Sequence, residues 1–307
     1  KVGIRRGEYV GDVKYRKAVS KRLRSLGFNE VKTYTLVSPE ASSSFDYEKK
    51  EKAVLPNPMS VDKSVIRTTL LPSLLQVYHY NKARKVEDIA VYEVAKTYDK
   101  SYQEESKIAF LMKGNYVVNP WKGSMPVDFY LMKGFVEDIL TYFGFQNRYS
   151  FEVSNIPDMH PGKSCQILLD RKPIGIFGQV HPNTCKDEVY VCEISLQALM
   201  QKVKPLKFKE ASKYPTIEKD VAFVVSKDVT SGSIEATIKK AGGRLLRSTE
   251  VFDVYEGEHV PEGMKSIAYN LLFMVEDRTL TDDEVMKVFN QIIDKVVSVH
   301  SAEVRDK

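Results

Sequence analysis

The order of hydrophobic periodicities in the last ninety residues limits the possible folds more than any other feature. The segment VAFVVS, at 221–226, has the composition of a buried strand. Ser231 is then expected to cap a helix whose Ile234 and Ile238 face the core. The segments RSTEVFDVYEG and KSIAYNLLFMVED follow as two strands separated by a loop. Thr281 and Glu284 have the spacing of a capping box, which predicts a last long helix.

A final short strand near Val299 to Val304 completes the order βαββαβ. This order predicts a ferredoxin-like module, to which we assign residues 205–307. The run KVKPLKFKE, at 202–210, contains a proline and many charges and is expected to be a linker. Because the ferredoxin-like fold supports many functions, the function has to be argued from particular side chains.

Residues 1–204 predict a second domain, and 307 residues are enough for two. Helical and strand periodicities are mixed here, which indicates an α+β domain with an antiparallel sheet covered by helices. Its expected elements are a helix at Tyr15 to Phe28, a strand at Glu30 to Val37, a helix opening near Pro72, a strand from Ile89, a helix capped by Asp128, and strands at Gln166 to Leu169 and Pro173 to Gly178.

Composition excludes several classes of protein. No apolar run approaches the ~18 residues of a membrane span, so no membrane association is expected. Three cysteines without a CxxC pair fit a reducing cytoplasm, and no secretory signal is expected. A chain that begins with Lys1 suggests a piece of a longer polypeptide. From Glu210 onward there are 13 basic and 18 acidic residues, against 33 and 23 before it, so the last domain cannot bind RNA through bulk charge.

The common catalytic signatures are absent, since the sequence contains no GxSxG, no HExxH and no phosphate-binding glycine loop. His181, Cys185 and Cys192 match no usual zinc spacing, so no metal site is expected. The segments 160–162 and 178–182, which contain histidine, glycine and proline, are interpreted as turns that bracket a pair of strands, with a substrate site as the alternative.

Three blocks together resemble a known family: NPMSVDKSVIRTTLLPSLL at 57–75, HPGKSCQILLDRKPIGIFGQVHP at 160–182, and FDVYEGEHVPEGMKSIAYNLLFMVEDRTLTDDEV at 252–285. They resemble the C-terminal part of the bacterial phenylalanyl-tRNA synthetase β subunit, in the family's order and over nearly the whole chain. The resemblance implies that residues 1–204 fold like a class II synthetase catalytic module. It also implies that residues 205–307 form the family's ferredoxin-fold anticodon-binding domain.

The chain departs from the catalytic members of class II. Where the arginine and glutamate of the second motif are expected it has 97–100, TYDK, and where the third motif is expected it has Glu193, Ser195 and Gln197 instead of glycines and arginine. Without cations to stabilise a polyanionic transition state, no catalytic residue is expected and this piece alone should be inactive. It should hold no cofactor, while ATP and magnesium are implied for the holoenzyme. The resemblance implies two protein partners, the catalytic α subunit, with the helix at Tyr15 to Phe28 as its interface, and a second αβ heterodimer.

The third partner implied is tRNA(Phe). Its anticodon, GAA, begins with guanine, whose Watson–Crick edge presents two adjacent N–H donors that a carboxylate can accept. Asp253 and Tyr255 lie two apart on a strand and therefore project to one face, where one can accept from the base while the other stacks on it. The resemblance points to the same pair and adds Ser266 as a contact to a later base. Candidate contacts to the tRNA backbone are Lys213, Arg244, Arg247, Lys265 and Arg278.

Two alternatives remain open from the sequence. The first domain could belong to a self-sufficient amino-acid-activating ligase, and the last could be an amino-acid-sensing regulatory module. A purely structural role for Asp253 and Tyr255 also remains open. Tyr on a half-buried strand commonly packs against the neighbouring strand, and Asp before a turn commonly accepts a hydrogen bond from the local backbone.

Overall fold

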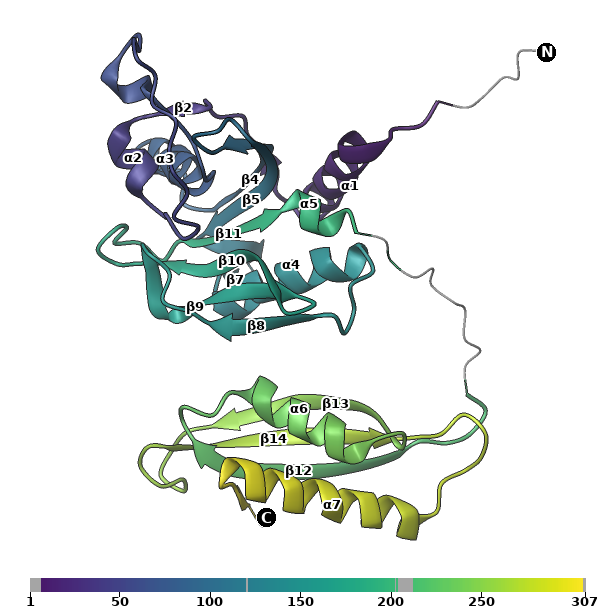
Figure 1. The fold of residues 1–307 in the computed structure, drawn as a ribbon. Helices are drawn as coiled ribbons and strands as arrows, with labels where there is room; N and C mark the ends of the chain where they lie inside the picture. The colour runs from purple at the N-terminus through teal and green to yellow at the C-terminus, as the bar shows by residue number, and fades with distance from the viewer. Residues whose placement is uncertain (1–6, 120, 202, 204–211, 306–307) are drawn as a thin grey trace, which may run out of the picture. The chain divides into compact units, whose positions relative to one another are not determined.

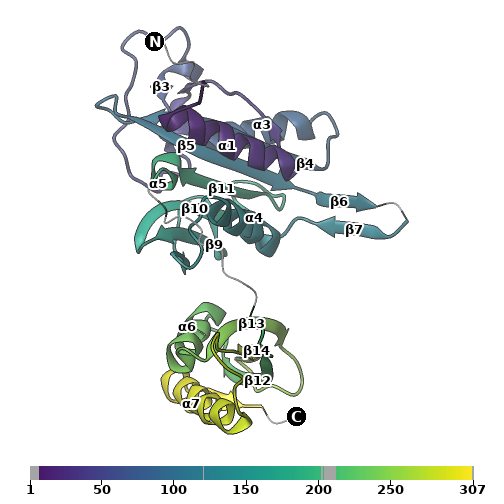
Figure 2. The same cartoon turned by 90° about the vertical axis from the view of Figure 1, so that its right-hand side faces the viewer.

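The computed structural model describes residues 7–119, 121–201, 203 and 212–305. The chain divides into two compact units, Lys1–Leu206 and Lys207–Lys307, which are shown in Figures 1 and 2 and are described separately below. The expected linker at 202–210 lies outside the described residues except for Val203. Among the described residues, no helix combines the length and apolar character needed to cross a membrane.

A seven-stranded sheet, with the order β1-β4-β5-β11-β10-β9-β8, forms the centre of the first unit. Neighbouring strands are antiparallel except for β1 and β4. The strands are β1 (Asn29–Glu30), β4 (Ile89–Tyr98), β5 (Glu104–Lys113), β8 (Tyr149–Val153), β9 (Met159–Leu169), β10 (Lys172–Val180) and β11 (Tyr190–Ser195). Two small sheets join β2 (Leu36–Val37) to β3 (Val65–Ile66) and β6 (Asn115–Asn119) to β7 (Gly123–Pro126).

Helices cover both faces of the large sheet, as expected for an α+β domain. One face packs against α1 (Gly11–Ser25), α4 (Phe129–Tyr142) and α5 (Leu196–Leu199), which share one apolar cluster with the strands. The other face packs against α3 (Leu71–Lys82) in a second cluster, and α2 (Pro39–Ser43) and a 3-10 turn (Val61–Lys63) lie in the connections. Asp128 caps α4 as predicted, because its carboxylate accepts from the Leu131 backbone N–H at 2.7 Å.

Two predictions for this unit are wrong in detail. The expected strand at Glu30 to Val37 is two short strands in different sheets, because the chain leaves β4 after Glu30 and pairs with β3 only from Leu36. The expected turn at 160–162 lies inside β9, and of the expected turn at 178–182 the first three residues lie inside β10, so only 181–182 are outside the strand. Gly178 lies at a register shift of β10 and not in a turn. Glycine is required there because a Cβ at 178 would lie 2.2 Å from the Lys163 carbonyl oxygen.

The second unit has the predicted βαββαβ order. Its elements are β12 (Ile217–Ser226), α6 (Ser231–Gly242), β13 (Leu246–Tyr255), β14 (Met264–Phe273), α7 (Asp282–His300) and β15 (Glu303–Val304), and the sheet order is β13-β14-β12-β15. Both helices lie on a single face of the sheet, as Figure 2 shows, and they share one apolar cluster with its strands. Helices of this unit therefore cover one face and leave the other open.

The helix ends of this unit follow local sequence signals. The capping box of Thr281 and Glu284 is present as predicted. The cap of α6 is Thr230 rather than Ser231, and the Thr230 hydroxyl accepts from the Ser233 backbone N–H at 3.3 Å. The last strand begins at Glu303 rather than near Val299, because α7 continues to His300 and Ser301 then takes a left-handed conformation with φ of 49°.

Candidate nucleic-acid interface

A β-bulge decides which way the predicted pair points. In β13, Val251 pairs with Tyr269 and Asp253 pairs with the next residue of β14, Ala268, so Phe252 is left without a partner. Side chains alternate along a strand, and one extra residue therefore reverses the faces. Val251 packs against the core beneath the helices, whereas Asp253 and Tyr255 both project from the open face. The two-residue spacing predicted a common face, and the register agrees.

The side chains next to Asp253 on the open face of the sheet are small; we call this pair of alanines, Ala222 and Ala268, the alanine floor. Ala268 of β14 pairs with Asp253 on one side and with Ala222 of β12 on the other. Two methyl groups therefore lie side by side where neighbouring strands are about 4.8 Å apart. The Asp253 side chain is exposed at the edge of this floor and accepts no hydrogen bond from the described residues. The result is a pair of small apolar side chains beside an exposed carboxylate.

Tyr255 lies against its own turn. Its ring is half-buried, and a Cβ added at Gly257 would lie 2.4 Å from the Tyr255 hydroxyl oxygen. Any side chain at position 257 would therefore displace the Tyr255 ring from this position. Gly257, two residues after the end of β13, thus leaves the space that the Tyr255 ring occupies.

Arg305 is the residue that sequence reasoning missed. Its backbone N–H donates to the Ala222 carbonyl at 2.9 Å, which fixes it beside β12 just after β15. Its guanidinium lies 5.2 Å from the centroid of the Tyr255 ring, within cation–π range. Arg305 is exposed and is 50 residues from Tyr255 in the sequence, so no local pattern links them. The only sequence signal is a cation two residues from the end of an acidic domain.

The remaining predicted residues are placed less favourably for a common surface. Ser266 pairs with Tyr255 across the strands and shares its face, but its side chain is only 4% exposed. Lys265 alternates to the opposite face and donates to the Lys227 carbonyl at 2.8 Å. Arg278 forms a bidentate pair with Glu284 at 2.6 and 2.7 Å.

The other three candidate backbone contacts are exposed and make no ion pair within the described ranges. They are Lys213 before β12, Arg244 after α6, and Arg247 at the start of β13. Because their charges are not neutralised by neighbours, these three are more available to phosphate than Lys265 or Arg278.

Where class II catalytic motifs are expected in the first unit, the charged side chains are buried or paired with one another. Glu193 is 0% exposed, and its carboxylate accepts from Lys107 at 3.1 Å, from the Tyr47 hydroxyl at 2.5 Å and from the Leu70 backbone N–H at 2.6 Å. A second buried pair joins Arg67, which directly follows β3, to Glu93 of β4 at 3.4 Å.

Charge in this cluster is balanced internally. Burial alone would lower the pKa of Lys107, but the carboxylates of Glu193 and Glu48 outweigh it and raise that pKa above its usual value. Burial and the neighbouring Glu193 carboxylate raise the pKa of the Tyr47 phenol. These groups satisfy one another, which leaves none of them to hold a phosphate.

The side chains of 97–100, where the second motif is expected, are also buried or engaged in contacts within the first unit. The Thr97 side chain is buried, and the Asp99 carboxylate accepts from the backbone of Ser101 and Gln103 at 2.8 and 3.1 Å. Lys100 pairs with Glu51 at 3.1 Å. In the described ranges, no three His, Cys, Asp or Glu side chains come together in a way that could bind a metal ion.

Comparison with known proteins assigns both units. The phenylalanyl tRNA synthetase beta chain CLM domain model matches residues 1–196, and the ferredoxin-fold anticodon binding domain model matches residues 212–305. The phenylalanine–tRNA ligase beta subunit of Bacillus subtilis is 37% identical over 301 residues, which cover 94% of this chain and 37% of that protein. That of Symbiobacterium thermophilum is 36% identical over 298 residues, covering 92% and 33%.

The chain thus spans between 33% and 37% of the length of these two relatives. Among solved structures, the pyrrolysyl-tRNA synthetase of Desulfitobacterium hafniense overlaps 61% of this chain and 66% of its own, with a TM-score of 0.46 and 14% identity.

Proposed function

This chain belongs to the phenylalanyl-tRNA synthetase β-chain family, and from that premise we propose that its second unit binds the anticodon of tRNA(Phe) during ATP-dependent charging with phenylalanine. The observation that carries this proposal is the exposed Asp253 carboxylate, which has no partner in the described residues and lies at the edge of the sheet face that the helices leave uncovered. Guanine, the first base of the GAA anticodon, offers two adjacent N–H groups to such a carboxylate. Adenine offers it an acceptor at one of those positions, so the carboxylate favours guanine.

The neighbours of Asp253 supply the rest of a base-binding surface. Tyr255 presents an aromatic face on which a base can stack, and the alanine floor admits a planar ring. Arg305 adds a cation to the same face, where it can approach a phosphate or the exposed face of a stacked base. Ser266 contributes to a later base if its hydroxyl is reached from the same side. Lys213, Arg244 and Arg247 are the backbone contacts that their free charges favour, with Lys265 and Arg278 secondary.

The first unit acts as a scaffold in this proposal. It pairs with the catalytic α subunit, and two αβ heterodimers assemble in the cytoplasm into the active ligase. ATP and magnesium belong to the holoenzyme, and the internally paired cluster around Glu193 supports a first unit that does no adenylate chemistry itself.

The test uses binding of anticodon stem–loops to the chain and to its Asp253→Asn variant. An asparagine keeps the shape but turns an N–H toward a guanine N–H, so a charge-assisted hydrogen bond of about 1.5–3 kcal/mol is lost. Affinity for the GAA loop should fall about 10- to 150-fold, and affinity for an AAA loop should change little, as measured by fluorescence anisotropy at fixed salt. Glu250→Gln, which removes an exposed carboxylate on the same strand, is the matched control.

Equal losses for the GAA and AAA loops would contradict the carboxylate model. Unchanged affinity for both loops would remove Asp253 from the site altogether.

A further inference from the structure

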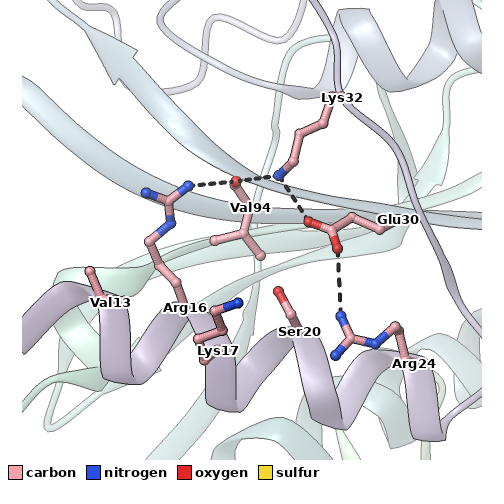
Figure 3. Close-up of a pocket in the computed structure, with 8 residues that line it drawn as sticks. All are labelled: Val13, Arg16, Lys17, Ser20, Arg24, Glu30, Lys32 and Val94. Carbon is pink, nitrogen blue, oxygen red and sulfur yellow. Dashed lines mark hydrogen bonds and ion pairs between the residues drawn. The ribbon is translucent and has the colours of Figure 1, made fainter. Parts of the chain in front are cut away.

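Each unit has a groove lined by several cations, and the two grooves differ in how those cations are engaged. Figure 3 shows the groove of the first unit, between α1 and the edge of the large sheet. Arg16 and Lys32 both donate to the Val94 carbonyl there, at 3.4 and 3.2 Å. Arg24 and Lys32 share the Glu30 carboxylate, at 3.5 and 2.9 Å. Most cations of this groove therefore already bind groups of the first unit itself.

The groove of the second unit lies between α6 and α7, and its cations have no such partners. It has a volume of about 800 Å³. Lys240 of α6 and Lys287 and Lys295 of α7 are exposed and form no ion pair with any residue that the structure describes. Asp294 is the one carboxylate among the lining residues, so three lysines leave the lining with a net positive charge. Residues 210–307 as a whole have the opposite balance, with 13 basic and 18 acidic residues.

The two lysines of α7 lie on one side of that helix. Lys287, Gln291 and Lys295 are each four residues apart, which is the spacing of neighbours on a helix surface. From Lys287 to Lys295 the helix rises about 12 Å. Over that length one strand of a double helix presents three or four phosphates, since it has about one per 3.4 Å of axis. The two lysines can thus contact different phosphates of one strand, and Lys240 adds a third cation from α6.

The uncharged lining residues favour a nucleic acid over a protein partner. They are two amides, one hydroxyl and one small apolar residue: Asn290, Gln291, Ser298 and Ala241. Amide and hydroxyl side chains commonly hydrogen-bond to phosphate and sugar oxygens. The centres of protein interfaces instead are rich in Trp, Tyr and Arg and depleted in lysine. The lining therefore matches a sugar–phosphate backbone.

The same lining favours a double helix over a single strand. Single-stranded nucleic acids bind largely by stacking their bases on aromatic side chains, and none of the lining residues is aromatic. Double-stranded RNA is recognised mainly through phosphates and 2′-hydroxyls, which lysines and amides can contact. The groove supplies both kinds of side chain.

We propose that the groove between α6 and α7 binds double-stranded RNA through its phosphates and 2′-hydroxyls, without regard to base sequence. The three lysines contact phosphates, and the amides of Asn290 and Gln291 contact ribose hydroxyls. The groove lies in the helical layer, whereas Asp253 projects from the opposite face of the sheet. The site is therefore separate from the anticodon surface, and the inference does not depend on anticodon binding.

The test measures binding of a short labelled RNA duplex, without a GAA loop, to the full chain by fluorescence anisotropy over a series of salt concentrations. The groove variant combines Lys240→Gln, Lys287→Gln and Lys295→Gln. The control variant makes the same change at three exposed lysines of the first unit: Lys122, Lys172 and Lys186. Because each phosphate contact contributes about one to the slope of log K against log salt, the groove variant should lose about 2–3 of that slope. It should bind about 10- to 100-fold more weakly at low salt, and the control should bind as wild type.

A second variant tests the same site in the opposite direction. Asp294→Asn removes the carboxylate of the groove and should tighten duplex binding about 2- to 5-fold, a gain that damage to the fold cannot produce. Two further measurements separate this inference from the proposed function. The groove variant should keep its preference for the GAA stem–loop over the AAA stem–loop, and Asp253→Asn should leave duplex binding unchanged.

Equal losses in the groove and control variants would overturn the inference, because bulk charge would then explain the binding. Absence of duplex binding by the wild-type chain at low salt would also overturn it. Tighter binding of a single-stranded RNA of the same length would indicate a stacking site instead, and tighter binding of a polyglutamate peptide would indicate a protein partner. A DNA duplex that binds as tightly as the RNA duplex would contradict recognition of the 2′-hydroxyls.

Discussion

The seven-stranded sheet of the first unit and the four-stranded sheet of the second unit place their charged side chains in opposite environments. On the large sheet of the first unit, Glu193 and Lys107 are completely buried and satisfy each other and the backbone around them. On the small sheet of the second unit, Asp253 is exposed, borders two alanines and has no partner in the described residues. A buried charge that is paired within the protein contributes to stability, whereas an exposed charge without a partner is available to bind a ligand.

The largest effect on stability should follow from breaking the buried ion pair of Glu193 and Lys107. Glu193→Ala removes the fully buried carboxylate partner of Lys107 and leaves only the partly exposed Glu48 beside the ammonium, which should lower the free energy of unfolding of the first unit by about 3–5 kcal/mol. Urea denaturation of the chain measures it. Glu188→Ala, at an exposed carboxylate of the same unit, should change stability by less than about 1 kcal/mol. A small effect at Glu193 would mean that the cluster opens to solvent.

Removing the aromatic ring of the open face should weaken RNA binding without unfolding the unit. Tyr255→Ala should cost about 1–3 kcal/mol of stem–loop affinity, since stacking on the ring is lost, and should affect GAA and AAA loops alike. Tyr255→Phe keeps the stacking face and should bind nearly as wild type. Discrimination that relaxes with Tyr255→Ala would show that the ring also reads base identity.

The turn after β13 offers a smaller and more specific perturbation. In Gly257→Ala the new methyl group would lie 2.4 Å from the Tyr255 hydroxyl, so the ring must shift. Stem–loop affinity should fall about 3- to 10-fold, less than for loss of the whole ring. In the Tyr255→Ala background the same glycine change should have no further effect on affinity. Additive losses would place Gly257 in contact with RNA directly.

The smallest expected effect is a change of protonation at the start of α7. Hydrogen bonds from Arg278 and from the Thr281 backbone lower the pKa of Glu284 to about 2. A lowered folded-state pKa means that this stabilisation is complete above the unfolded-state value of about 4.3 and is lost as pH falls through about 2. Carbon NMR of the Glu284 carboxyl measures the titration. Arg278→Met should move the pKa toward its usual value, and an unmoved midpoint would exclude the arginine as its cause.

Sequence reasoning reached the features that local chemistry determines. The Asp128 cap, the Thr281–Glu284 box and the common face of Asp253 and Tyr255 depend on residues two or three positions apart. The extended strand expected at Glu30 to Val37 failed because pairing partners far along the chain, β4 and β3, take its two ends separately.

The sequence by itself determined the order of elements in the second unit and the residue types of the candidate interface, since periodicity and spacing are local properties of the chain. Only the tertiary structure decided that Phe252 forms a bulge that directs Asp253 to the open face, that Arg305 lies beside Tyr255, and that Glu193 is closed off by Lys107. Each of these depends on strands that meet across long sequence separations. Sheet register and burial decide such contacts, and neither is encoded in any short segment.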